Sequence, residues 1–368
     1  MMRMRLQRRG QAGFTFVELM VGLTIGLFLV LIITQVMGTF ESRGRATIGN
    51  ADAQTNGGIA LYTIGSDMQM AGHSLFSGSN APLQCATTES TITGINGDLT
   101  PVAITDGAGG ASDTITIRYG NSSRGGVFTR IAVAPVGPED AVSVANNMVC
   151  DSVNQVALIV KGSACALARV TGPDTLGQPD DASGTPRDTT TLQLADNAHA
   201  VEGADITCLG AWHEITYSVS NDQLVRQDTW LTPGGDVQTS AVPILSGIVS
   251  LQAQYGIAAT ANSNQITQWV NASGTWATPE MTVADRNRIK AVRLAVIARN
   301  AKPDPAQVTA ACSSTTAAAP TGLCAWAGTT ASPAPAIAFT DANWQQYRYR
   351  SFETILPLRN VIWARGSL

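Results

Sequence analysis

The strongest pattern in the chain is an almost unbroken apolar run from Phe14 to Phe40, which a single charged residue, Glu18, interrupts. As an α-helix with a rise of about 1.5 Å per residue, the run is long enough to cross a bilayer whose hydrocarbon core is about 30 Å thick. We therefore expect residues 14–40 to form a transmembrane helix.

After this run the chain becomes polar, but apolar residues still recur at helical spacing. The residues of this weaker stripe are Ile48, Ile59, Leu61, Ile64, Met68 and Phe76. The spacing predicts that residues 41–78 continue the helix as an amphipathic segment.

Beyond residue 110 the apolar period shifts from helical spacing to two, which is typical of strands. Two such segments flank Ser220, Asn221 and Asp222 and form the clearest hairpin candidate. The fold class is therefore α+β: a long N-terminal helix followed by a mainly antiparallel β-sheet head, residues 79–368, with long loops. The predicted strand segments are 113–119, 127–135, 155–160, 212–219, 223–230, 244–257 and 288–299.

Composition and charge exclude several classes of protein. Only 14% of the 368 residues are charged, which excludes a disordered chain, and the net charge of −4 argues against a nucleic-acid-binding module. The leader is basic instead, because Arg3, Arg5, Arg8 and Arg9 all precede the apolar run. By the positive-inside rule the head then lies on the far side of an inner membrane, in the periplasm.

All six cysteines follow the apolar run, in the compartment where disulfides persist. None forms a CxxC pair, which disfavours a zinc site. We expect a disulfide between Cys312 and Cys324, because the segment between them has little apolar content to order it. The pairing of the other four cysteines stays open among several connectivities.

The sequence offers no catalytic constellation. His73, His199 and His213 lack a nucleophile or metal ligand at usable spacing, and no HExxH, GxSxG or phosphate-loop motif is present. The aspartates of residues 171–188 have no EF-hand spacing, so we interpret them as a solvated loop. We expect no enzyme activity, no catalytic residue, no cofactor and no bound metal.

The beginning of the chain, RRGQAGFTFVELMVGL, resembles the class III signal of type IV pilins and pseudopilins. The resemblance implies that prepilin peptidase cleaves between Gly13 and Phe14, removes residues 1–13 as a leader and methylates the new amino terminus at Phe14. Glu18 becomes the fifth residue of the processed chain. A carboxylate within an apolar helix costs about 2.5 kcal/mol or more unless it finds a partner, and the amine of a neighbouring subunit is the implied partner.

Further motifs resemble PilW-type minor pilins. The end of the predicted helix, IALYTIGSDMQMAGHSLFSG, matches the family pattern at Ala60, Leu61, Ile64, Asp67, Met68, Ala71, Gly72 and, with a slip of one residue, Gly78. Gln69 and His73 depart from that pattern. The segments ending in Tyr255 and Gly256, residues 289–299 and residues 347–360 extend the resemblance. Residues 80–240 carry no family motif, and we expect loops and insertions there.

The resemblance implies a minor pilin that assembles with other minor pilins to prime type IV pilus assembly near the pilus tip, in support of twitching motility or adhesion. The implied partners are prepilin peptidase, other minor pilins, the major pilin and the inner-membrane assembly platform, with no nucleic acid. The protein would cross the inner membrane once and later reach the pilus surface. Two alternatives stay open: a pseudopilin of type II secretion, and a signal-anchored periplasmic binding or enzymatic domain.

Overall fold

A computed structural model describes residues 13, 15–75, 85–125, 127–137, 140–173, 176, 189–278 and 280–363. The chain divides into two compact units, Met1–Ala51 and Asp52–Leu368. The first helix, α1 (Phe16–Met70), contributes residues to both units.

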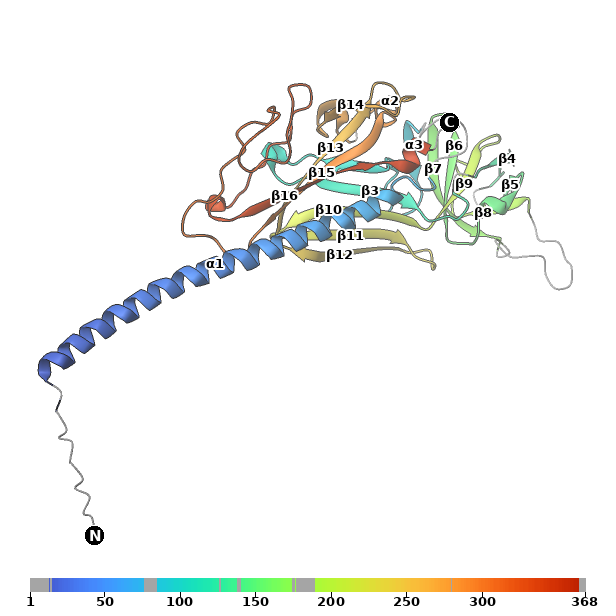
Figure 1. Ribbon diagram of the computed structural model, residues 1–368. Coiled ribbons are helices and arrows are strands. Elements are labelled where there is room, and N and C mark those ends of the chain that lie inside the picture. Colours follow the sequence, from blue (N-terminus) through green and yellow to red (C-terminus); the bar gives the residue numbers. More distant parts are fainter. Residues whose placement is uncertain are drawn as a thin grey trace, which may run out of the picture. The chain divides into compact units, whose positions relative to one another are not determined.

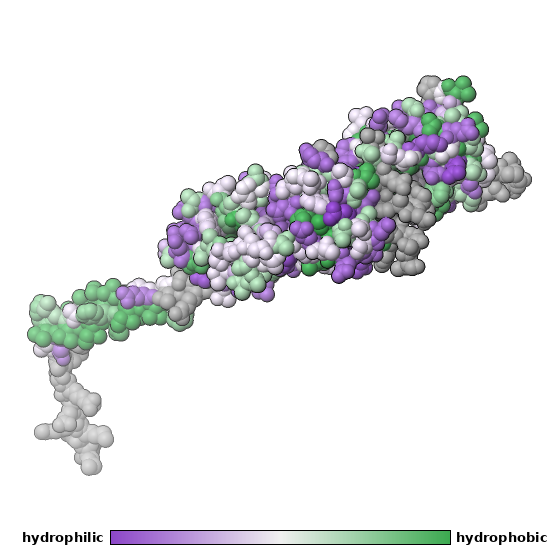
Figure 2. All heavy atoms as spheres, turned by 90° about the horizontal axis from the view of Figure 1, so that it is seen from above, coloured by the Kyte–Doolittle hydropathy of each residue, from purple (hydrophilic) through white to green (hydrophobic). Residues whose placement is uncertain are grey.

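In the first unit, α1 is the apolar segment expected from the sequence. Its stretch Phe16–Gly38 is long and apolar enough to cross a membrane. All side chains of this stretch are exposed in the isolated chain, and Figure 2 shows them as a continuous hydrophobic surface. Phe14, where the predicted segment begins, lies outside the described residues.

In the second unit, one face of α1 is buried in the head. The buried positions are spaced by three or four residues, as one face of a helix requires, and most of them are small: Ala53, Gly57, Ala60, Ile64, Gly65 and Met68. Ile59, which the sequence placed on the buried stripe, is instead 45% exposed. Ile64 and Met68 of the predicted stripe are buried, and small side chains make most of the other contacts because strands of the head pass close to the helix.

The helix ends at Met70, earlier than the expected residue 78. Gly72 has a φ of 76° and Ser74 a φ of 62°, in the left-handed region that terminates helices. His73 lies in this turn, where its Nδ1 is 2.9 Å from the carbonyl oxygen of Gly120. Residues 76–78 lie outside the described part of the chain.

The described strands of the head form three sheets, and Figure 1 shows most of these strands with their labels. Their strand orders are β12-β11-β10-β3-β2, β14-β13-β15-β16 and β1-β7-β6-β9-β4-β5-β8. The strands are β1 (Thr87–Ser90), β2 (Val102–Thr105), β3 (Thr114–Gly120), β4 (Thr129–Val133), β5 (Val142–Val144), β6 (Val156–Lys161), β7 (Ala164–Gly172), β8 (Thr191–Leu194), β9 (Asp205–Gly210), β10 (Trp212–Ser220), β11 (Gln223–Leu231), β12 (Val237–Ser246), β13 (Ile248–Ala258), β14 (Ile266–Val270), β15 (Ile289–Arg299) and β16 (Tyr349–Pro357). The short helices after α1 are η1 (Ala108–Gly110), η2 (Asn147–Val149), η3 (Gly274–Trp276), α2 (Val283–Arg286), η4 (Trp344–Gln346) and α3 (Arg359–Trp363).

The first two sheets share one hydrophobic core with the buried face of α1. Ile64 and Met68 of the helix belong to the same cluster as Tyr217 of β10 and Tyr255 of β13. The predicted hairpin is present as β10 and β11, which pair in antiparallel register from His213 opposite Trp230 onward. The α+β class expected from the sequence is therefore confirmed.

The third sheet closes on itself. Strand β7 pairs with β6 on one side and with β8 on the other, so β7-β6-β9-β4-β5-β8 forms a small barrel, and β1 joins β7 in parallel. The barrel encloses its own apolar cluster, which includes the disulfide Cys150–Cys208. A second disulfide, Cys85–Cys165, links β7 to the start of the described segment before β1. The expectation of loops and insertions in residues 80–240 is thus wrong in part, because the six strands between Thr129 and Gly210 form a folded barrel.

The segment between β15 and β16 contains the third disulfide and covers the far side of β15. Cys312 pairs with Cys324, the pair expected from the sequence. Trp326 is 4% exposed and packs with Ile297 of β15. Burial of Trp326 gives this polar, alanine-rich segment an anchor on the sheet.

Candidate functional site

The start of α1 brings together two residues of the predicted assembly segment. The backbone N–H and the hydroxyl of Thr15 each donate a hydrogen bond to Glu18 Oε2, both at 3.1 Å. In return the Glu18 N–H donates to the Thr15 hydroxyl oxygen at 3.3 Å. This reciprocal pattern is a capping box, which satisfies backbone donors that the first helical turn leaves without partners. Gly13 is exposed just before it, whereas Phe14 lies outside the described residues.

The capping box fixes the position of the Glu18 carboxylate. A negative charge in the first turn is also favoured by the helix dipole, so the carboxylate is stabilised within its own chain. Both bonds from Thr15 end on Oε2, and in the described part of the chain no donor is seen on Oε1. Glu18 can therefore receive one further donor without breaking the cap.

A second polar site fastens α1 to the head. Asp67 Oδ2 accepts a hydrogen bond of 2.5 Å from the Tyr217 hydroxyl and one of 3.0 Å from Arg226 Nε. Burial raises the pKa of Tyr217, and the hydrogen bond to Asp67 raises it further. Burial alone would lower the pKa of Arg226, but the bond to Asp67 outweighs it and the net shift is upward. Both shifts keep the two donors protonated, so Asp67 holds β10 and β11 against the helix.

This polar cluster continues along the same sheet without becoming a catalytic site. Asp228 lies 3.5 Å from Arg226 Nη1 and 3.6 Å from His213 Nδ1, and His213 stacks on Tyr119 at a ring separation of 5.1 Å. Burial, followed by the charges of nearby aspartates, raises the pKa of Tyr119 to about 12. No group of three or more metal-binding side chains occurs among the described residues.

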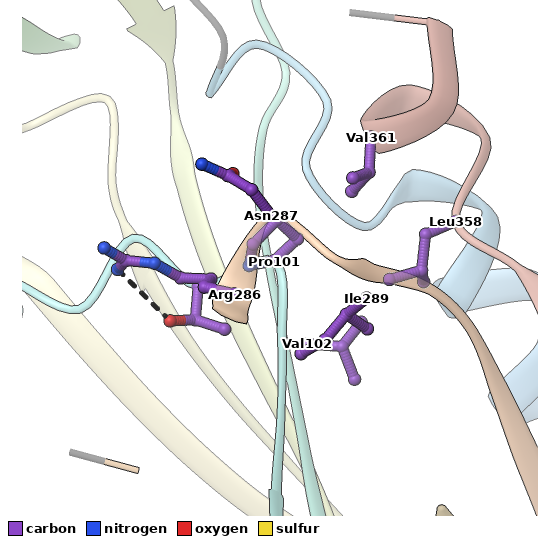
Figure 3. A pocket seen from close by; sticks show the side chains of 8 residues that line it. Pro101, Val102, Arg286, Asn287, Ile289, Leu358 and Val361 are labelled. Atoms are coloured by element: carbon purple, nitrogen blue, oxygen red, sulfur yellow. Dashed lines mark hydrogen bonds between the residues drawn. The ribbon is translucent and has the colours of Figure 1, made fainter. Parts of the chain in front are cut away.

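Figure 3 shows a cavity of the head that is too small for a ligand. Its volume is about 10 Å³, enough for one water molecule at most. Apolar side chains of Val102, Ile289, Leu358 and Val361 form most of its wall. The guanidinium of Arg286 points away from these groups toward Thr100, at 3.5 Å. The cavity is a packing void of the core.

Two matches to known families cover the regions that carry these features. Residues 8–34 match the prokaryotic N-terminal methylation motif, and residues 214–360 match the type IV pilus-assembly protein W family, PilW. The two matches together support a PilW-family type IV pilin. No curated protein and no solved structure is significantly similar to it. PilW proteins are structural components of the pilus. The class III signal fits a membrane-anchored pilin and implies processing by prepilin peptidase and contact with the pilus assembly machinery.

The PilW match begins in β10 and runs through β16, so it includes both strands of the hairpin that bonds to Asp67. The sequence singled out Asp67 and Glu18 but missed the residues that hold them. Thr15 could have been found, because a threonine three residues before a glutamate is the signature of a capping box. Arg226 could not, because it is 159 residues from Asp67 along the chain.

Proposed function

We propose that this PilW-family protein is a minor pilin that joins other minor pilins to prime type IV pilus assembly near the tip. The observation that carries the proposal is the start of α1: an exposed apolar helix with a single carboxylate, Glu18, fixed by its own cap. An exposed apolar surface of this length needs lipid or other apolar helices to cover it. A pilus subunit meets both environments in turn.

Cleavage between Gly13 and Phe14 supplies the missing partner for Glu18. Removal of the basic leader leaves a positively charged amine at Phe14, which is then methylated by the same peptidase. The amine of one subunit donates to the Glu18 carboxylate of the next, and in an apolar bundle this pair adds to the cap in offsetting the cost of burying the carboxylate. Gly26 supports such packing, because it leaves a hollow between Leu23 and Val30 on the helix surface into which a neighbouring side chain fits.

The head is proposed to be periplasmic before assembly and exposed at the pilus afterwards, where it contacts the other minor pilins and the major pilin. Three disulfides support this location, because they persist in oxidising compartments. A role in twitching motility or adhesion follows from assembly into a pilus.

The test is mass spectrometry of the mature N-terminus, in cells with and without prepilin peptidase. We expect a peptide that begins at N-methylated Phe14 and disappears without the peptidase. In the same cells Glu18→Gln is expected to be processed but to enter sheared pili at a small fraction of the wild-type amount. An intact arginine-rich leader in both strains would overturn the proposal and leave an anchored periplasmic domain.

A further inference from the structure

Strand β12 forms an unusual edge of the head. Its 10 residues, VQTSAVPILS, include no charged side chain, and residues 238–243 are all exposed. Natural sheet edges are usually short, charged or covered, because their unpaired N–H and C=O groups attract further strands. In the part of the chain that the structure describes, residues 238–242 have none of these protections, and the edge is interrupted only beyond them, by Pro243 and by a register shift opposite Leu224 and Val225.

The other edges of the two sheets around α1 are protected. On β2, the Ile104 N–H donates to the Tyr255 hydroxyl at 2.6 Å. On β14, the Trp269 N–H donates to the Ser332 hydroxyl at 3.1 Å. Strand β16, YRSFETILP, carries charged side chains. The open edge at β12 is therefore a property of this strand and not of the sheets in general.

The turn between β11 and β12 shows which backbone groups face outward. The Thr232 N–H donates to the Asp236 carbonyl at 2.8 Å, so these two residues form a hydrogen-bonded pair. In an antiparallel ladder such pairs alternate with non-hydrogen-bonded pairs. With the observed register, the N–H and C=O groups of Thr239, Ala241 and Pro243 point away from β11.

Two further observations indicate that the same backbone groups of β12 point away from β11. Pro243 has no N–H, and proline is accepted in a strand only where the N–H would face away from the ladder. The hydroxyls of Thr229 and Thr239 lie 3.0 Å apart, as expected of a close, non-hydrogen-bonded pair. The outer edge of β12 thus offers N–H donors at Thr239 and Ala241 and carbonyl acceptors at these residues and Pro243.

We propose that β12 is a docking edge that accepts one strand from a neighbouring pilin subunit of the same anchored assembly. The incoming strand would be uncharged where it lies beside residues 238–243, because a charge there would find no partner on β12. The small side chains of Ser240 and Ala241 let a second backbone approach. This partner assignment rests on the proposed function of the chain as a pilin.

The limited contact area argues for a subunit that is already nearby. A single added strand buries much less than the roughly 1,200–2,000 Å² of a stable interface between free proteins. Pairing therefore needs a high effective concentration, which anchoring in one membrane or one filament supplies. A freely diffusing second copy of the chain does not meet this condition.

Hydrogen exchange resolved to single amides tests the proposal on the full-length chain. It compares detergent-solubilised protein with the same protein in purified pili or in its cross-linked membrane assembly. We expect the amides of Thr239 and Ala241 to exchange freely in the isolated chain and to slow by at least about tenfold in the assembly. The amides of Ser240 and Val242, which pair with β11, are protected in both and serve as the internal control.

A pair of variants separates the backbone from the side chain. Ala241→Pro removes an outward N–H without touching the ladder to β11, whereas Ala241→Ser keeps the N–H. We expect Ala241→Pro to retain the thermal stability of the isolated chain but to enter the assembly several-fold less, and Ala241→Ser to behave as wild type.

Three results would overturn the docking edge. The first is unchanged exchange at Thr239 and Ala241 in an assembly that contains the chain. The second is equal incorporation of Ala241→Pro and Ala241→Ser. The third is protection that appears in the isolated chain as its concentration rises, which would assign the edge to a second copy. If instead the chain keeps its leader and enters no assembly, the proposed function fails first, and the N-terminal mass measurement shows this separately.

Discussion

Thr15 and Glu18 hold each other across the first turn of α1, each accepting a hydrogen bond from the backbone of the other. The glutamate of this capping box is thus also the carboxylate proposed to join subunits. Positioning of Glu18 and stability of the helix start cannot be separated in this arrangement.

We expect Thr15→Val to weaken the helix start by about 1 kcal/mol, because the side-chain cap is lost. The Glu18 carboxylate then keeps only the hydrogen bond from the backbone N–H of residue 15 and is held less firmly, so incorporation into sheared pili should fall while cleavage after Gly13 continues. Immunoblots of pili and membranes measure the first effect, and N-terminal mass spectrometry measures the second. Thr15→Ser, which keeps the hydroxyl, is the control; an equal defect in Ser and Val variants would contradict the role of the cap.

Tyr217→Phe removes the hydroxyl that donates to Asp67 and should lower the free energy of unfolding by about 1–2 kcal/mol. Asp67→Asn weakens the same contact and that with Arg226. Because both substitutions remove one shared interaction, the double variant should be less destabilised than the sum, with a coupling of about 1 kcal/mol. Chemical denaturation of the detergent-solubilised chain measures it. Strict additivity would show that the bond does not fasten the helix.

Gly57 and Gly58 provide a matched pair on neighbouring faces of α1. A Cβ on Gly57 would overlap the ring of Phe352 in β16, whereas one on Gly58 meets nothing within 4 Å. Gly57→Ala should therefore destabilise the head by about 1–3 kcal/mol through overpacking, and Gly58→Ala should stabilise it by up to about 1 kcal/mol through helix propensity. Phe352→Leu should relieve part of the Gly57→Ala defect. Similar effects of both alanines on the unfolding midpoint would refute the close contact.

Asp113 makes the stability of the head depend on pH. It is 1% exposed and accepts backbone hydrogen bonds from Gly107 at 2.8 Å and Ala253 at 2.7 Å. Burial outweighs these bonds and, with the nearby Asp106 charge, raises its pKa to about 7. The folded chain therefore binds a proton that the unfolded chain has already released.

Because the folded-state pKa lies above the unfolded one, the stabilising contribution of Asp113 is complete below about pH 4 and is lost as the pH rises through 7. Across that pH range, Asp113 alone then lowers the free energy of unfolding by at most roughly 4 kcal/mol. Urea midpoints at pH 5 and pH 8 measure the loss. Asp113→Asn, although less stable at pH 5, should flatten the slope; an unchanged slope would assign it to other carboxyl groups.

The sequence predicts the elements whose pattern is long and regular. The apolar run, the period-two segments and the turn at Asn221 and Asp222 led directly to α1 and to the β10–β11 hairpin. The latter two residues have φ values of 50° and 57°, as a tight two-residue hairpin turn requires. The α+β class follows from these elements alone.

The barrel was missed for a physical reason. Strands β5 and β8 have 3 and 4 residues, too few for a period to stand out from chance. Their stability comes from closure of the barrel around a shared core, a tertiary effect that local sequence does not record. The same holds for the site that fastens α1: Asp67 is visible as a motif residue, but its partners Tyr217 and Arg226 are set by strand register far along the chain.

Gly120 of β3 and Trp212 of β10 are partners in the sheet, so the chain leaves this sheet after Gly120 and re-enters it at the residue directly opposite. All the strands of the barrel lie between these two residues, together with the disulfide Cys150–Cys208. The region is thus an insertion between two paired strands, and the Cys85–Cys165 disulfide and the pairing of β1 with β7 fasten it a second time, to residues that precede β2. Removing it would also take away the partners of Cys85 and of β1, so the barrel is an integral part of the head.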